Sequence, residues 1–223
     1  LKHFCINRQL RWQSMSDSEL TNFTSSTSVH HHILVDDSHK ILVCVPPKSG
    51  CTTWKTILAN NSAKGPLPSG FDVMSLHFNN RLDGYGIKNL GDYSPKQIRN
   101  ILQNYYKFLV VRHPLERIVS AYIDKLQSGR DPEWQQSLGR KILKALKRKA
   151  SPRQIFYGTG VEFSEFIWYI KQFDESNVHW DPNYVLCHPC ELEYDKIVKL
   201  ETHKEDTYDI IKRKLAPTSF GFG

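Results

Sequence analysis

A buried strand that passes through a short polar loop into a helix is the feature that most constrains this fold. Residues 41–58 read ILVCVPPKSGCTTWKTIL, an apolar run followed by two prolines, a lysine, a glycine and a helix-like segment. Where a strand leads directly into a helix, the free amides of the first helical turn and the helix dipole attract anions. Gly50 allows close approach of the backbone, and Lys48 adds a full positive charge. Hydroxyl donors follow at Thr52 and Thr53, so the stretch favours a phosphate-binding turn over an ordinary turn with a solvent-exposed lysine.

A second strand-to-helix unit occurs later in the chain. Residues 107–114, KFLVVRHP, read as a buried strand stopped by proline, and residues 115–126 place apolar side chains at helical spacing. A helix with serine as N-cap and proline in its first turn is predicted over 94–106, between the two units. Arg112 ends the second strand and Ser120 lies inside the helix that follows, so the pair could hold a second phosphate. Two such units indicate an α/β fold, with a central parallel sheet flanked by helices.

The rest of the chain gives weaker signals. Residues 1–30 are polar and irregular and end near three adjacent histidines, so a flexible, stem-like lead-in is expected before a catalytic domain at 31–223. Residues 33–45 predict a hairpin or a strand with a short preceding edge strand, because two apolar runs flank a turn-forming Asp-Asp-Ser. An aromatic amphipathic helix is expected over 162–173, and a strand-like end occurs at Ile197 and Val198.

Length and composition limit the alternatives. With 223 residues and 39% hydrophobic residues, the chain is expected to form one globular domain, and it has no apolar run of 18 residues that could span a bilayer. The formal charge of +7 favours anionic partners without identifying them. Five cysteines include one CxxC at Cys187 and Cys190, with no second pair to complete a zinc site, so no metal is expected.

A basic run lies between the second strand-to-helix unit and the aromatic helix. Residues 140–153, RKILKALKRKASPR, contain seven basic and no acidic side chains, with an apolar strip at helical spacing. A solvated helix face is the simpler interpretation of such a run, and a docking surface for a polyanion is the alternative.

The two strand-to-helix units carry a resemblance to a known family. PPKSGCTTWK and VVRHPLERIVSAYIDK resemble the 5′-phosphosulfate loop and the 3′-phosphate site of sulfotransferases that use 3′-phosphoadenosine 5′-phosphosulfate (PAPS). Longer segments, HHILVDDSHKILVCVPPKSGCTTWK, LQNYYKFLVVRHPLERIVSAY and HWDPNYVLCHPCELEYDKIVKLET, resemble the Golgi carbohydrate sulfotransferases of chondroitin, dermatan and related glucuronyl glycans. The likeness covers about residues 30–206, in order.

The resemblance implies roles for individual residues. Lys48 would stabilise charge on the bridging oxygen of PAPS, and Arg112 and Ser120 would bind its 3′-phosphate. His77 is the preferred general base, because a histidine accepts a proton near neutral pH, and His179 competes for that role. The residues expected around the 5′-phosphosulfate are Pro47, Lys48, Ser49, Gly50, Cys51, Thr52, Thr53 and Trp54. Those expected to bind the acceptor are His179, Trp180, Lys144, Lys147 and Arg148.

The resemblance also implies a cellular context. PAPS would be the co-substrate, an acidic glycosaminoglycan-like chain the acceptor, and the Golgi lumen the location. A type II membrane anchor would precede the printed sequence, and the catalytic domain could be incomplete at its C-terminus. Sequons at Asn22 and Asn60 would be usable in that compartment. The acceptor hydroxyl, the cysteine pairing and the oligomeric state stay open.

Two other function classes compete with this one. A kinase-like phosphotransferase would show a GK[ST] turn and a carboxylate for magnesium, and neither is evident in the sequence. A nucleic-acid-binding protein could use the basic run at residues 140–153, although no known recognition motif accompanies that run.

Overall fold

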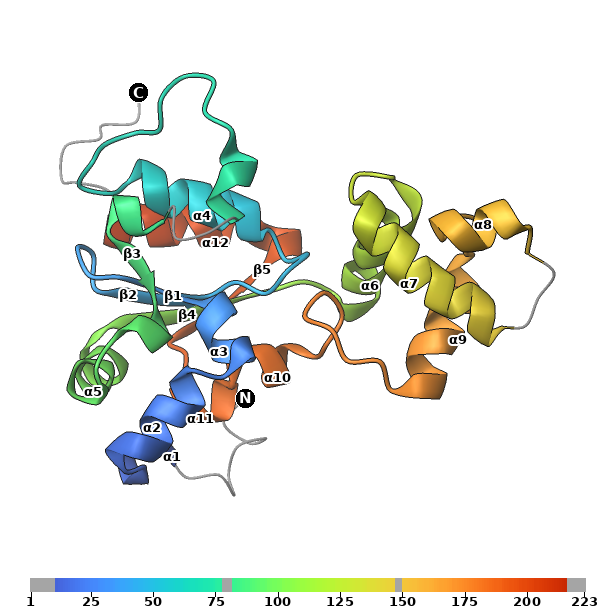
Figure 1. Ribbon diagram of the computed structural model, residues 1–223. Helices are drawn as coiled ribbons and strands as arrows, with labels where there is room; N and C mark the ends of the chain where they lie inside the picture. Colours follow the sequence, from blue (N-terminus) through green and yellow to red (C-terminus); the bar gives the residue numbers. More distant parts are fainter. Residues whose placement is uncertain (1–10, 78–81, 147–149, 216–223) are drawn as a thin grey trace. The chain divides into compact units, whose positions relative to one another are not determined.

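The protein is described by a computed structural model, which covers residues 11–77, 82–146 and 150–215 (Figure 1). The chain divides into two compact units. Residues 1–112 and 182–223 belong to the first unit, and residues 113–181 form the second. The first unit contains the sheet, and the second is helical where the structure describes it.

The first unit is built on a five-stranded sheet with the order β3-β1-β2-β4-β5. Its strands are β1 (Ile33–Asp36), β2 (Ile41–Cys44), β3 (Ile87–Asn89), β4 (Tyr106–Val111) and β5 (Lys196–Lys199). β1 pairs antiparallel with β2 and β3, which confirms the predicted hairpin. β2 and β4 pair in parallel, as do β4 and β5. The α/β class is confirmed, and the parallel part of the sheet is its β2-β4-β5 half.

The apolar runs form the inner strands β1, β2 and β4, which are buried on both faces, whereas the edge strands β3 and β5 have exposed residues. All four residues of β2 are buried, as expected for a strand with protein on both sides. On one face, Phe108 of β4 packs in a core with Trp54 of α4 (Cys51–Asn60) and Ile210 of α12 (His203–Ile210). Figure 1 shows α4 and α12 together on that face.

Helix α5 (Pro95–Asn104) forms where the sequence predicts it. Ser94 is the N-cap, and Pro95 occupies the first turn, where the missing amide costs no hydrogen bond. Ile98 and Leu102 are buried on its inner side. The buried Lys107 of β4 donates from Nζ to the Leu102 carbonyl oxygen at 2.8 Å, which satisfies a free carbonyl near the helix C-terminus.

The chain before β1 is more ordered than its composition suggests. The sequence predicts an irregular lead-in over residues 1–30, but in its described part, from residue 11 onward, the chain forms α1 (Arg11–Ser14), α2 (Asp17–Thr24) and the start of α3 (Thr27–His32). The polar residues responsible for the wrong expectation act as caps: Ser16 and Glu19 form a capping box at the start of α2. Leu20 and Val29 are fully buried.

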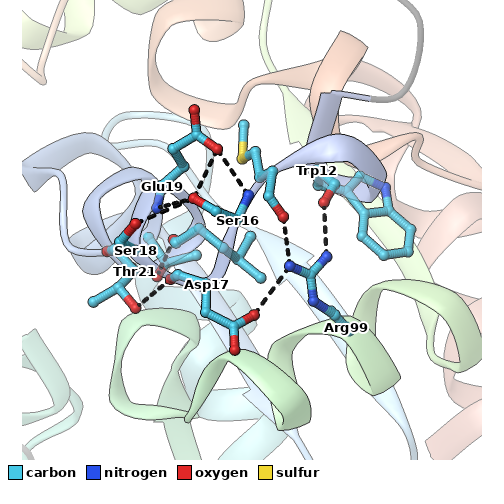
Figure 2. Close-up of polar contacts among 10 residues, drawn as sticks. Trp12, Ser16, Asp17, Ser18, Glu19, Thr21 and Arg99 are labelled. Carbon is cyan, nitrogen blue, oxygen red and sulfur yellow. Dashed lines mark hydrogen bonds and ion pairs between the residues drawn. The ribbon is translucent and has the colours of Figure 1, made fainter.

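An arginine from α5 holds these N-terminal helices (Figure 2). Arg99 donates hydrogen bonds to the carbonyl oxygens of Trp12 at 3.1 Å and Met15 at 2.5 Å. It also pairs with the Asp17 carboxylate at 3.1 Å. These are contacts between segments far apart in sequence, so local sequence patterns do not predict them.

Shorter elements complete the first unit. They are η1 (Val73–His77), η2 (Asp83–Tyr85), η3 (Leu90–Asp92), α10 (Asn183–Cys187), α11 (Pro189–Leu192), η5 (Leu200–Thr202) and the π-helical turn η6 (Ile211–Leu215).

The second unit packs helices around its own apolar core. Its helices are α6 (Pro114–Tyr122), which continues as the π-helical turn η4 (Ile123–Gln127), α7 (Pro132–Ala145), α8 (Pro152–Tyr157) and α9 (Phe163–Phe173). Phe166 of α9 is fully buried in a core with Leu138 and Ile142 of α7. The predicted helices over 115–126 and 162–173 are therefore confirmed.

A disulfide crosses the first unit. Cys44, the last residue of β2, is bonded to Cys187 at the end of α10, and both are fully buried. The cross-link closes a 143-residue stretch of sequence that includes all of the second unit. A cross-link over so long a stretch removes much conformational freedom from the unfolded chain. Sequence analysis left the cysteine pairing open.

Replacing Cys187 with alanine should lower the free energy of unfolding by about 2–5 kcal/mol, because the unfolded chain gains conformational freedom. Denaturant unfolding monitored by circular dichroism measures this loss. Cys51→Ala is the matched control, since Cys51 carries a free thiol and is half-buried. Equal loss of stability in the two variants would show that the disulfide has no special role.

Candidate active site at the carboxyl ends of the parallel strands

The loop between β2 and α4 has the backbone shape of an anion-binding turn. Lys48 and Gly50 both adopt left-handed conformations, with φ of 67° and 85°. The Ser49 amide donates to the Pro46 carbonyl oxygen at 3.3 Å, which tightens the turn. The helix starts immediately afterwards, with the Trp54 amide bonded to the Gly50 carbonyl oxygen at 3.1 Å. The amides of the first turn of α4 therefore lie beside the loop, at the positive end of the helix dipole.

Ser49 supplies a buried polar group that the described residues do not satisfy. Its side chain is fully buried, and its Oγ has no hydrogen-bond partner among those residues. A buried hydroxyl without a partner is costly, since it has lost its hydrogen bonds to water. An anionic oxygen bound in the loop would restore such a bond.

Arg112 joins this loop from the neighbouring strand. It directly follows β4, and its Nη1 donates to the Lys48 carbonyl oxygen at 3.3 Å. Because β2 and β4 are parallel neighbours, their carboxyl ends lie at the same edge of the sheet. The structure thus brings Lys48 and Arg112 together.

The end of β5 reaches the same loop. A Cβ atom added to Gly50 would lie 3.1 Å from Cδ1 of Leu200, the first residue after β5. The loop is therefore packed closely against Leu200, and glycine suits position 50 both for its positive φ and because a larger residue would press on the Leu200 side chain.

Other residues predicted around the 5′-phosphosulfate have varied surroundings. Pro47, Cys51 and Thr52 are half-buried, and Thr53 is exposed. Trp54 is buried, with its ring 4.9 Å from that of Phe108, so its indole supports the loop from the core. Each of these residues belongs to the loop or to the first turn of α4.

Lys55 is a residue that sequence reasoning missed. Burial lowers the pKa of its ammonium group below the usual value, and the nearby Cys51 thiol raises it in part. Cys51 and Lys55 are one turn apart on α4, so a half-buried cation accompanies the loop. In the sequence, the four-residue spacing of Cys51 and Lys55 on a predicted helix could have indicated that the two side chains lie close together.

The structure describes the side chain of only one of the two proposed bases, His179. His77 is the last residue of η1 in the first unit, and its side chain lies outside the described part of the chain. His179, in the second unit, has its ring Nδ1 2.7 Å from the Asn177 side-chain oxygen. Their catalytic roles remain predictions.

The predicted acceptor residues and Ser120 belong to the second unit. Trp180 packs against Phe166 and donates from its indole nitrogen to the Glu175 carbonyl oxygen at 2.7 Å, so it stabilises the core of this unit. Ser120 is half-buried on α6, and Lys144 is exposed on α7. Lys147 and Arg148 lie outside the described residues.

Metal-binding clusters and membrane-spanning helices are both absent from the described residues. Residues 11–77, 82–146 and 150–215 contain no group of three or more His, Cys, Asp or Glu side chains able to hold a metal ion. In those same ranges, none of the helices has the length and apolar character needed to cross a membrane.

The β2-loop-α4 segment and Arg112 form a candidate anion-binding site in an α/β protein, and comparison with known proteins identifies its family. Residues 31–220 match the sequence profile of the Sulfotransferase family. The chain is 33% identical to rat carbohydrate sulfotransferase 11 over 95% of its own length and 63% of the relative's. It is 37% identical to human carbohydrate sulfotransferase 14, over 86% of this chain and 48% of that protein. The chain therefore belongs to the sulfotransferase family.

Two further facts accompany this assignment. The chain spans between about half and just under two thirds of the length of these curated relatives. No solved structure matches the chain significantly.

Replacing Gly50 with alanine should weaken binding of 3′,5′-adenosine bisphosphate about tenfold, because the new Cβ must displace the loop from Leu200. Gly65→Ala is the matched control, since Gly65 has a similar φ of 82° but open space around its Cα. Both variants should lose roughly 1–2 kcal/mol of stability from the left-handed backbone. Isothermal titration calorimetry measures the affinity, and equal affinities in the two variants would contradict this account of the loop.

Proposed function

We propose that this protein is a carbohydrate sulfotransferase, which transfers a sulfuryl group from PAPS to a hydroxyl group of a glycan. The observation that carries the proposal is the loop at Lys48, which combines first-turn amides, a buried hydroxyl without a partner and an arginine from the next strand. Family membership favours this function over the phosphotransferase and nucleic-acid alternatives. The curated relatives are named as carbohydrate sulfotransferases.

The residues of the loop fit the 5′ end of PAPS. Ser49 Oγ and the amides of the first turn of α4 would donate hydrogen bonds to the phosphosulfate oxygens. Arg112 would bind the 3′-phosphate through its guanidinium group, which suits phosphate geometry. Ser120 is proposed as a second ligand of that phosphate from the family resemblance alone. The proposal requires no metal ion.

The proposed sulfuryl transfer depends on a positive charge beside the leaving phosphate. When bound, PAPS supplies the sulfuryl group and leaves as 3′,5′-adenosine bisphosphate. The acceptor oxygen forms a bond to sulfur while the bond from sulfur to the phosphate oxygen breaks, and negative charge grows on that phosphate. Lys48 would neutralise this charge. The acceptor proton would pass to His77, with His179 as the alternative base.

The acceptor is proposed to be an acidic, chondroitin-like glycosaminoglycan. Lys144, Lys147 and Arg148 would attract it through long-range electrostatics, and His179 and Trp180 are the other residues proposed to bind it. Lys144 is exposed, as this role requires.

The proposed location is the Golgi lumen, with a type II membrane anchor in a preceding segment. The Cys44–Cys187 disulfide supports an oxidising compartment. Asn22 and Asn60, the two sequon asparagines, are exposed, as glycosylation in a secretory compartment would require.

Replacing Lys48 with alanine should abolish sulfuryl transfer from labelled PAPS to chondroitin, with a loss of at least about 100-fold in kcat, because the leaving phosphate loses its counter-charge. Lys40→Ala is the matched control: Lys40 also has a positive φ, of 53°, and lies in the turn before β2, at the opposite end of that strand. The control should retain normal turnover. Near-normal transfer by Lys48→Ala would remove Lys48 from the mechanism.

A further inference from the structure

The second unit contains a polar groove that the proposed reaction centre does not use. It lies between the first turns of α7 and the short helix α8, two helices that run side by side in Figure 1. Its volume of about 510 Å³ is within the roughly 300–1,000 Å³ of small-molecule sites. The lining side chains that matter here are Glu133, Gln135, Gln136, Arg153, Tyr157 and Thr159.

The walls of this groove are held together by direct backbone contact. An added Cβ at Gly139 of α7 would lie 2.0 Å from the Gly158 carbonyl oxygen, so only glycine permits this approach. Arg140 and Gln136 then donate to the Phe156 carbonyl oxygen at 2.8 Å and 3.0 Å. The groove is therefore built on fixed helices, which favours a binding site of defined shape.

The two glutamines present acceptor atoms in fixed positions. Gln135 donates from Nε2 to the Leu126 carbonyl oxygen at 2.8 Å, and Gln136 donates from Nε2 to Phe156. Each side-chain nitrogen is thus held by the backbone, and neither side-chain oxygen has a partner among the described residues. Amide oxygens held in this way suit ligands rich in hydroxyl donors.

Arg153 and Tyr157 add a charge and an aromatic face. Arg153 is exposed, and within the described ranges its side chain makes neither a hydrogen bond nor an ion pair. Tyr157 is 52% exposed, and its ring packs edge-on against Phe156, 4.9 Å away. An exposed ring supported by a second ring offers a rigid apolar surface for the C–H face of a sugar.

We propose that the α7–α8 groove binds an acidic sugar unit of the glycan acceptor, through residues other than those assigned to the reaction centre. The assignment of a glycan as ligand rests on the proposed function. Arg153 pairs with the carboxylate or sulfate of the sugar, the glutamine oxygens accept hydrogen bonds from its hydroxyls, and Tyr157 packs against its ring. Such a subsite holds a long acceptor chain and lengthens its residence on the enzyme.

The charge pattern of the groove favours a glycan over a nucleic acid. Glu133 lies in the same groove as Arg153, so the lining combines one negative with one positive side chain. A nucleic acid carries one phosphate per nucleotide, and Glu133 would repel that regular series of charges. A glycosaminoglycan carries hydroxyls between its charged groups, which match Glu133 and the glutamines.

The test measures binding of a chondroitin hexasaccharide to the full chain with 3′,5′-adenosine bisphosphate present. Arg153→Gln should weaken this binding at least about fivefold, and should scarcely change binding of the same hexasaccharide after reduction of its carboxyl groups. Tyr157→Ala should weaken binding of the original and of the carboxyl-reduced hexasaccharide to a similar extent. Arg130→Gln is the matched control, because Arg130 is also exposed in the second unit but does not line the groove.

Hydrogen exchange locates the binding independently of the variants. The hexasaccharide should protect amides of residues 152–160 in the original protein and not in Arg153→Gln. The proposal would be overturned if Arg153→Gln and Arg130→Gln weakened hexasaccharide binding equally. It would also be overturned if an oligonucleotide bound as tightly as the hexasaccharide and protected the same amides. Affinity for the bisphosphate alone tests the proposed function separately, so failure of the groove and failure of the sulfotransferase assignment are distinguishable.

Discussion

The hydrogen bond from Arg112 to the Lys48 carbonyl oxygen is the contact on which the candidate site depends. It joins two loops that are 64 residues apart in the sequence, and it can form because β2 and β4 are parallel neighbours in the sheet. Without that pairing, the lysine loop and the arginine would be two unrelated basic positions. With it, they form one positively charged edge that also includes the start of α4 and the end of β5.

The disulfide at Cys44 fixes the strand that leads into this edge of the sheet. Cys44 ends β2 just before the loop, and its disulfide with Cys187 ties the strand to α10. On the other side of the loop, the buried ring of Trp54 packs against Phe108 of β4. Both ends of the loop are thus attached to the core, which keeps its left-handed residues and the unsatisfied Ser49 hydroxyl in place.

Sequence patterns predicted the elements that local chemistry determines. The apolar run before Lys48, the Ser94–Pro95 start of α5 and the proline stop after Arg112 each identified a real boundary. The N-terminal helices escaped prediction because a distant arginine, Arg99, satisfies their carbonyl groups. The Cys44–Cys187 pairing also required the tertiary structure, since spacing alone leaves several pairings open.

The central claim is that the Lys48 loop and Arg112 form one site for a nucleotide with phosphates at both ends of its ribose. Calorimetry with 3′,5′-adenosine bisphosphate and with adenosine 5′-phosphate tests it directly, on the original protein and on Arg112→Ala. The account predicts that the original protein prefers the bisphosphate by at least about tenfold, and that Arg112→Ala loses most of this preference while still binding the 5′-phosphate. An unchanged preference in Arg112→Ala would contradict it.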